Sequence, residues 1–446
     1  MNGRLRTMIA FVAALLAAMV SALPAGATKI ERVVSPSGIA AWLVHESSLP
    51  VIALNFAFLG GSSQDPADKP GVGNMAVSLL DNGAGELDSK AFQDRVEASA
   101  TQMRFWVTRD YLQGSIRMLS DRRDQSIDLL RLALNQPRFD ADEIERGRAQ
   151  IMARLRRETT DPNSVANKIW WATAFADHPY ERPSEGLLES VPGINVDDLR
   201  SFLGRVLARD GLKIVAVGDI DAATLGAVLD RVFGSLPARG QVAPVLDLPP
   251  RAAGRRIVVP LDVPQSVVYM GGTGIARNDP DFLAAYLVNH VLGGGSFTSR
   301  LYNEVREKRG LAYGVYSYLL PLRHSAMLMA STQASADRTG QALELIETQI
   351  RRMVEEGPTE EELAKAKSYL KGSFALSFDT SSKIANQLLH IQLDDLGIDY
   401  VDKRNSLIDA VTIDDARRAA GRLASGGMFV TVVGRPKELA SKEPGG

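Results

Sequence analysis

The residue types that most often carry catalysis are either missing from this chain or too scattered to act together. There is no cysteine, which excludes a thiolate nucleophile, a disulfide and a cysteine zinc site. The five histidines are His45, His178, His290, His324 and His390, and no two of them stand three or four residues apart. Neither a His-x-x-Glu-His nor a His-Glu-x-x-His pattern occurs. We therefore predict that no metal is bound by a helical histidine pair in this chain.

A glycine-rich segment in the second half of the chain invites comparison with phosphate-binding loops. It consists of Gly293, Gly294, Gly295 and Ser296. It lacks both the Gly-Lys-Ser/Thr ending of a phosphate loop and the spacing of a dinucleotide fingerprint. We therefore reject nucleotide binding, and one simple interpretation is the end of a helix, where glycine allows a positive φ.

The N-terminus has the parts of a secretory signal peptide. Arg4 and Arg6 form a positive start, residues 8–23 are almost wholly apolar, and Ala25 to Ala27 is a small-residue cleavage site. The apolar stretch is shorter than the ~20 residues that a spanning helix needs. We expect cleavage after Ala27, a periplasmic protein and no membrane contact afterwards. The net charge of −2 and the lack of a basic stripe argue against a nucleic-acid partner.

The mature chain is too long for one hydrophobic core and reads as two copies of one plan. A single core rarely serves more than ~250–300 residues, and this chain has 446. The apolar strand predicted at 51–59 has a counterpart at 266–270, and the strand predicted at 213–218 has one at 429–434. The two strands of each pair are about 215 residues apart, and such a constant offset is typical of an internal repeat.

The predicted architecture follows from this repeat. We expect a signal peptide at 1–27, one domain at 28–240, an extended linker at 241–254 and a second domain at 255–446. Helices and strands mix without regular alternation in each copy, which favours the α+β class. A clear amphipathic helix is predicted at 141–158, where apolar residues recur at helical spacing. The fold class is therefore α+β, with two tandem similar domains, each a mixed or antiparallel sheet flanked by helices.

Three segments together resemble the insulinase (pitrilysin) family of zinc peptidases. They are the glycine and serine residues at 60–63 with Pro70 to Gly73, the segment 175–183, and the segment 293–313. The resemblance spans the mature chain and points to the bacterial branch that is similar to mitochondrial processing peptidase. It implies the metallohydrolase fold of that branch and a role in peptide cleavage.

The resemblance also locates where a zinc site should be. Active members carry His-x-x-Glu-His on the helix after the first glycine-rich strand, and a Glu ligand on a later helix. The matching positions here are Asn74, Val77, Ser78 and Arg154. Asn and Ser are poor zinc ligands, Val cannot accept a proton, and a guanidinium repels a cation. We predict that this chain binds no zinc and needs no cofactor of its own.

Arg306 and Tyr313 match an Arg-x6-Tyr pair that the family places in its C-terminal domain. The resemblance implies that this pair closes over the substrate near the zinc site, where both groups can donate to a carbonyl oxygen as it becomes an oxyanion. The alternative is a surface arginine and a packed strand tyrosine. The segment from Gly293 to Ser296 resembles a shortened substrate-handling loop, and that interpretation and the helix end both stay open.

The functional hypothesis is therefore a division of labour. A homologous subunit that bears His-x-x-Glu-His supplies zinc, and this chain binds peptide substrates and contributes Arg306 and Tyr313 in a heterodimer. The alternatives are a purely structural module and a standalone peptide-binding protein of the same fold. Retention of the Arg306 and Tyr313 pair favours the first hypothesis.

Overall fold

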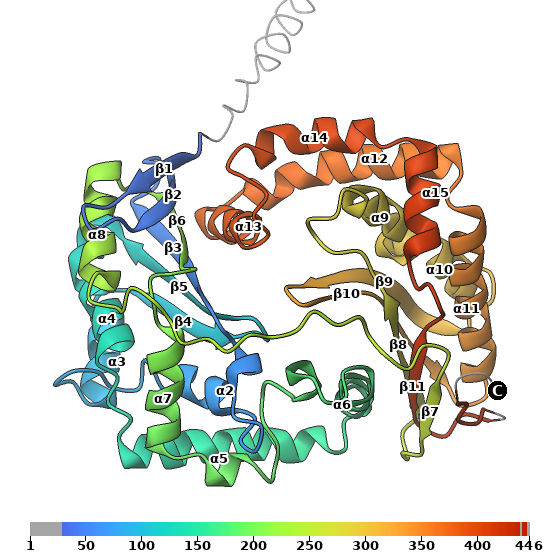
Figure 1. Cartoon of the computed structure of the whole chain (residues 1–446), viewed down its shortest axis with the longest axis horizontal. Coiled ribbons are helices and arrows are strands. Elements are labelled where there is room, and N and C mark those ends of the chain that lie inside the picture. The colour runs from blue at the N-terminus through green and yellow to red at the C-terminus, as the bar shows by residue number, and fades with distance from the viewer. Residues whose placement is uncertain (1–28, 438, 444–446) are drawn as a thin grey trace, which may run out of the picture.

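The protein is described by a computed structural model, which covers residues 29–437 and 439–443. The expected signal peptide lies outside these residues. Within them, the chain forms two β-sheets that lie on opposite sides of the molecule, each with helices on its outer face (Figure 1). No helix in these ranges is long and apolar enough to cross a membrane. The α+β class predicted from the sequence is confirmed.

The first sheet is built from the first half of the chain. Its order is β1-β2-β6-β3-β5-β4. The strands are β1 (Glu31–Val34), β2 (Ala40–His45), β3 (Val51–Leu59), β4 (Gln102–Val107), β5 (Tyr111–Leu119) and β6 (Lys213–Gly218). β2 and β6 pair in parallel and the other neighbours pair antiparallel, so the sheet is mixed.

The second sheet repeats this plan. Its order is β7-β11-β8-β10-β9. The strands are β7 (Arg256–Val259), β8 (Gln265–Thr273), β9 (Ala312–Leu322), β10 (Ser325–Ser335) and β11 (Phe429–Val433). β7 and β11 are parallel, as β2 and β6 are, and the remaining pairs are antiparallel. The two sheets therefore share one topology, with β1 as the extra strand of the first, and the predicted repeat is confirmed.

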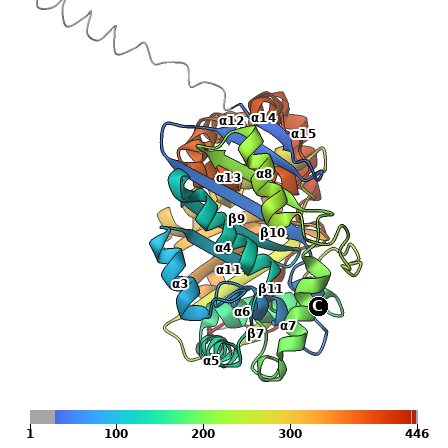
Figure 2. The ribbon, with the colours of Figure 1, turned by 90° about the vertical axis from the view of Figure 1, so that its left-hand side faces the viewer.

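The helices fall into a first and a second set along the chain. The first set is α2 (Val72–Val77), α3 (Ser89–Ala98), α4 (Arg123–Asn135), α5 (Ala141–Glu158), α6 (Pro162–Ala174), α7 (Val196–Val206) and α8 (Ala222–Phe233). The second set is α9 (Phe282–Asn289), α10 (Arg300–Tyr302), α11 (Thr339–Glu356), α12 (Glu360–Phe374), α13 (Ser381–Leu393), α14 (Tyr400–Ala410) and α15 (Ile413–Arg422). Figure 2 shows α3, α4 and α8 in front of the first sheet, which places them on its outer face.

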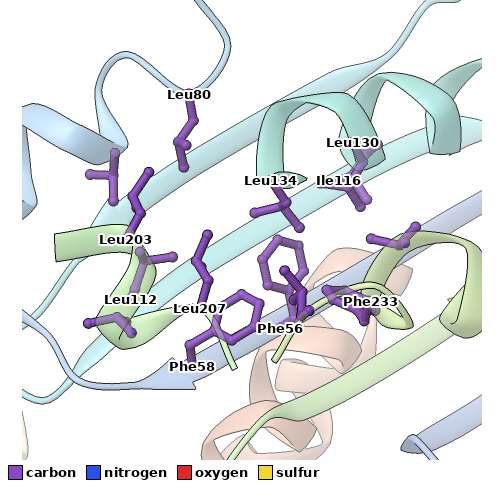
Figure 3. Close-up of a cluster of buried hydrophobic side chains, with 14 of the residues drawn as sticks. Phe56, Phe58, Leu80, Leu112, Ile116, Leu130, Leu134, Leu203, Leu207 and Phe233 are labelled. Carbon is purple, nitrogen blue, oxygen red and sulfur yellow. The ribbon is translucent and has the colours of Figure 1, made fainter. Parts of the chain in front are cut away.

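Both faces of the first sheet are buried, and β3 shows how. Phe56 and Phe58 point to the outer face, where they meet Phe233 of α8 and the leucines of α4 (Figure 3). Ala53 and Ala57, which alternate with them, point to the inner face. A strand that is covered on both sides reads as a continuous apolar run, as the sequence of β3 does.

Two helices cross from one half of the chain to the sheet of the other. α13, from the second half, packs through Leu388 and Leu389 on Ala53 and Ala57 of the first sheet. α6, from the first half, packs through Trp170 on the inner face of the second sheet. Figure 1 shows both helices between the two sheets. Each half therefore buries a main core of its own on the outer face of its sheet, and a helix from the other half covers the inner face.

The segment between the two halves contains no helix or strand over residues 241–254. It is held along its length by hydrogen bonds. Ala243 N donates to Gln64 Oε1 at 2.7 Å, and Leu248 N donates to the carbonyl of His324 at 3.0 Å. The segment is extended, as expected, but fixed in place. The domain limits given above stay a prediction.

Candidate functional site

The helix that should carry the first zinc ligands is short and carries none of the required groups. α2 bears Asn74 and Val77, and Ser78 follows at its C-terminus. Val77 is 3% exposed and belongs to the core, while Ser78 Oγ donates to the carbonyl of Met75 at 2.9 Å. Asn74 is half-buried. An amide, a valine and a hydroxyl committed to its own helix do not form a zinc site.

α2 is held in place by a buried carboxylate. Asp65 accepts hydrogen bonds from the backbone N–H groups of Gly71 and Gly73, both at 2.8 Å. Gly71 has φ of 101°, and a Cβ there would lie 2.7 Å from the Cα of Gly186, so only glycine fits. Burial raises the pKa of Asp65 to about 7, although these N–H groups and the nearby Arg182 lower it. The Pro70 to Gly73 motif thus fixes the start of α2.

The expected third ligand position lies in a cluster of ion pairs. Arg154, on α5, donates from Nε to Glu158 at 3.1 Å and approaches Glu185 at 3.5 Å. Lys168 of α6 pairs with the other oxygen of Glu158 at 3.1 Å. Two cations thus compensate these carboxylates, which leaves little to attract a metal ion. Within residues 29–437 and 439–443, no group of three or more His, Asp or Glu side chains is placed to hold a metal.

The residues present therefore do not fit zinc, although the scaffold around them matches. α5 packs close to the turn after α2, where a Cβ at Gly147 would lie 3.1 Å from Leu79. The two helices that carry the ligands in active relatives, by the resemblance, are thus neighbours here. The side chains that would make a metal site are what differ.

Arg306 and Tyr313 are brought together. Arg306 lies in a π-helical turn (Asn303–Glu307), and Tyr313 is the second residue of β9. The Arg306 guanidinium carbon is 4.5 Å from the Tyr313 ring centroid and 5.0 Å from the ring of Tyr302. Tyr313 is 81% exposed and lines the large cavity described below. The pair is a stacked cation and phenol, of which Tyr313 lines the cavity and Arg306 is half-buried.

The glycine-rich segment ends a helix and packs on β9. After α9, residues His290–Gly294 form a π-helical turn, and Gly295 N donates to the carbonyl of His290 at 2.8 Å. A Cβ on Gly293 would lie 2.5 Å from Ser317 Oγ, so glycine is required for this close approach. Phe297, which directly follows this segment, is 70% exposed. The segment does follow the end of a helix, but the positive φ lies at Ser296 (47°) and not at a glycine, and substrate handling stays a prediction.

A cavity of about 800 Å³ lies between the two halves. From the first half, Arg109 and Trp171 contribute, with the Arg109 guanidinium carbon 3.5 Å from the Trp171 ring centroid. From the second half, the inner face of the sheet contributes Tyr269, Tyr316 and Tyr318. The ion-pair cluster of α5 and α6 lies at the same wall. A cavity of this size, with aromatic rings among many polar and charged side chains, is large enough to hold a ligand.

Most residues of this wall were not among the predicted site residues. Tyr316 and Tyr318 stand two apart in a strand and so share a face, and this spacing is a sequence signal that points to them. Of the two adjacent tryptophans, Trp170 lies wholly in the core. Trp171 is largely buried but its ring meets Arg109 and lines the cavity. The position of Arg109, in the turn between β4 and β5, carries no sequence signal of this kind.

A buried network fixes one end of the cavity. Tyr180 Oη donates to Asp110 at 2.5 Å and accepts from the backbone N–H of His324 at 3.2 Å. Asp110 also accepts from the N–H of Arg323 at 3.1 Å, so the β9–β10 turn is tied to the first half. Burial raises the pKa of the Tyr180 hydroxyl. His178 accepts from Tyr180 N at 3.1 Å and contacts the linker carbonyl of Leu246 at 2.9 Å, which is a structural role.

Comparisons with known proteins agree with this architecture. The family model described as insulinase (peptidase family M16) matches residues 43–186, and the one described as peptidase M16 inactive domain matches residues 193–370. A solved peptidase M16 inactive domain from Pseudomonas fluorescens superposes with a TM-score of 0.86, at 28% identity, over 93% of this chain and 100% of that one. The fold and the altered zinc positions thus define a two-domain peptidase-like protein.

The chain belongs to the insulinase family, peptidase family M16. Among its relatives, the non-peptidase homolog YmxG of Helicobacter pylori is 27% identical over 76% of this chain and 78% of that protein. An uncharacterised zinc protease of Streptomyces coelicolor is 25% identical over 93% of this chain and 91% of its own length. The relatives therefore include a protein named as a non-peptidase and others named as proteases.

Proposed function

We propose that this chain is the non-catalytic, substrate-binding subunit of a periplasmic heteromeric zinc metallopeptidase. A homologous subunit with an intact His-x-x-Glu-His helix supplies the zinc and cleaves the peptide. This chain holds the substrate and donates Arg306 and Tyr313 to the partner's site. The observation that carries the proposal is the contrast between the two halves. Asn74, Val77 and Arg154 are unsuited to zinc, whereas Arg306 stacks at 4.5 Å on Tyr313, which lines the cavity.

Physical chemistry supports the role of the pair. A fixed guanidinium fork and a phenol hydroxyl can both donate to the oxygen of a carbonyl that becomes negatively charged during hydrolysis. Arg306 forms no ion pair within the described residues, so its donors are available. The relatives give further support, because one is named a non-peptidase homolog.

The test is reconstitution. The mature chain and a zinc-bearing homologue from the same source are purified, mixed, separated by size-exclusion chromatography and assayed with fluorogenic peptides. We expect a mixed complex whose rate exceeds that of either chain alone. A complex that forms but gains no activity would favour the structural module. Peptide binding by this chain without any complex would favour the standalone binding protein.

A further inference from the structure

Arg109 is a cation in the cavity that forms no ion pair with a carboxylate of the described residues. It lies in the turn between β4 and β5 and is largely enclosed. Its Nε donates to the carbonyl of Tyr180 at 3.3 Å, and its planar group stacks on Trp171. Within the described residues, no acidic side chain forms an ion pair with it. Burial lowers the pKa of the guanidinium, which nevertheless stays charged because an arginine rarely loses its proton.

Three acidic residues line the same cavity, and two of them, Glu158 and Glu185, have cation partners. Glu158 pairs with Arg154 and with Lys168 at 3.1 Å each, and Glu185 lies 3.5 Å from Arg154. Glu181 accepts a backbone hydrogen bond from Asp177 at 2.9 Å. A charge that is taken out of water without a partner is costly. Glu185 is near enough to Arg109 to raise the pKa of its guanidinium, but none of these carboxylates forms an ion pair with it, so a ligand carboxylate can do so.

The opposite wall indicates what surrounds that anion. Tyr316 and Tyr318 present stacked rings with centroids 6.4 Å apart, and Tyr316 is half-exposed. Tyr269 lies beside them, its hydroxyl 3.3 Å from that of Tyr318. Aromatic rings offer apolar contact area with hydrogen-bonding edges, which suits a peptide more than a small inorganic ion.

We propose that this cavity binds peptide through a carboxylate that pairs with Arg109, while a neighbouring side chain of the peptide packs on Tyr316 and Tyr318. The inference rests on the proposed function in that the ligand is a peptide. Tyr313 lines the same cavity, so a peptide held at Arg109 extends toward the Arg306 and Tyr313 pair. The carboxylate belongs either to an acidic side chain or to the peptide's C-terminus. Arg109 is thus a specificity determinant for acidic peptides or for peptide ends.

The experiment measures binding to the full mature chain alone, so that it does not depend on cleavage. The probe is an alanine-rich octapeptide with one tyrosine and a fluorescent N-terminal label, studied by fluorescence anisotropy. Three forms separate the sources of the carboxylate: a free C-terminus, an amidated C-terminus, and an amidated C-terminus with one internal glutamate. We expect the carboxylate-bearing form that fits the site to bind about tenfold or more tightly than the uncharged form, since hydrogen bonds to charged groups are strong.

Variants assign the effect to Arg109. Arg109→Gln should bring the affinity for the carboxylate form down to that for the uncharged form. Arg109→Lys, which keeps the charge and loses the planar fork, should keep part of the preference. Arg104→Gln is the matched control, because Arg104 is exposed on the neighbouring β4 and lines a different cavity. It should bind as the wild type does.

Three results would overturn the inference. They are equal binding of all peptide forms, an unchanged preference in Arg109→Gln, and no peptide binding at all. The first two leave the proposed function standing, because the subunit can bind peptides without reading a carboxylate. The third result would contradict both the inference and the proposed function, since each requires this chain to bind peptide. If Arg109→Gln does not fold, as judged by circular dichroism, the comparison of peptide forms on the wild type and on Arg109→Lys decides.

Discussion

The crossing of α6 onto the second sheet makes Trp170 the most exacting test of the fold. Its side chain is 0% exposed, and its Nε1 donates to the carbonyl of Phe429 at 3.1 Å. The ring stacks on Phe429 at 6.1 Å and meets Tyr269 edge-on at 5.9 Å. A Cβ on Gly271 would lie 2.3 Å from the indole, so that strand residue must be glycine where Trp170 rests.

Trp170→Ala should therefore lower the free energy of unfolding by about 4 kcal/mol. Truncation of a buried aromatic ring typically costs ~3–5 kcal/mol, through lost transfer energy and the cavity left behind. Trp170→Phe keeps most of the ring contacts but leaves the Phe429 carbonyl without its donor, which costs about 1–2 kcal/mol. Gly271→Ala forces the indole to move and should cost ~1–3 kcal/mol.

The double variant Trp170→Ala with Gly271→Ala tests whether the two residues compete for the same space. The added methyl group enters space that the missing indole has vacated, so the two costs should not add. We expect the double variant to be more stable than the sum of the single effects by about 1 kcal/mol or more. The measurement is urea unfolding followed by far-UV circular dichroism.

Trp106→Ala serves as the control, because Trp106 is half-buried on the edge strand β4. Trp106→Ala should lower the free energy of unfolding by less than half as much as Trp170→Ala does. If Trp170→Ala costs no more than this control, or if the Trp170 and Gly271 effects add in full, then α6 does not rest on the second sheet in the way described.

Three further predictions follow from the site. The purified chain should hold no stoichiometric zinc by metal analysis, and about one zinc per chain that disappears in Asn74→Ala would contradict this. Burial raises the pKa of Asp65 from 3.8 to about 7, so the native state holds this proton more tightly than the unfolded state, and stability falls as pH rises through that interval. Asp65→Asn should remove this fall, and an unchanged pH profile of urea unfolding would refute it. Tyr180→Phe should lower the free energy of unfolding by about 1–3 kcal/mol, because Asp110 loses a buried donor. The control Tyr369→Phe, on the exposed face of α12, should change it by almost nothing when both variants are compared by thermal unfolding.

Several elements could be predicted from the sequence because local pattern alone determines them. The helix expected at 141–158 and the strand expected at 51–59 have those same limits in the structure. α2 is short, over Val72–Val77, because Leu79 and Leu80 form i to i−3 bonds and the chain turns away. α9 ends at Asn289 and is followed by a π-helical turn over His290–Gly294, which includes the first two glycines of the run.

The long-range features could not be predicted. Apolar periodicity shows that α6 and α13 each have a face to bury, but it does not tell which sheet covers that face. The crossing of both helices therefore needed the structure. The same holds for the cavity, because Arg109 and Tyr316 are about 200 residues apart in the chain and meet only through that crossing. The assignment of Asn74, Val77, Ser78 and Arg154 to the zinc positions rests on the family resemblance and stays a prediction.

The central claim is that this chain contributes donors to a site whose metal lies in another subunit. The most direct measurement is peptide cleavage by the reconstituted complex with Arg306→Ala or Tyr313→Phe in this chain, and with Arg309→Ala as the control. Arg309 is exposed nearby and pairs with Glu304 at 2.5 Å, so its loss should not matter. Donors to an oxyanion are typically worth ~10²–10³ in rate, so we predict a loss of tens-fold or more from each pair variant, with the complex intact by size-exclusion chromatography. Full activity of the double variant would contradict the account.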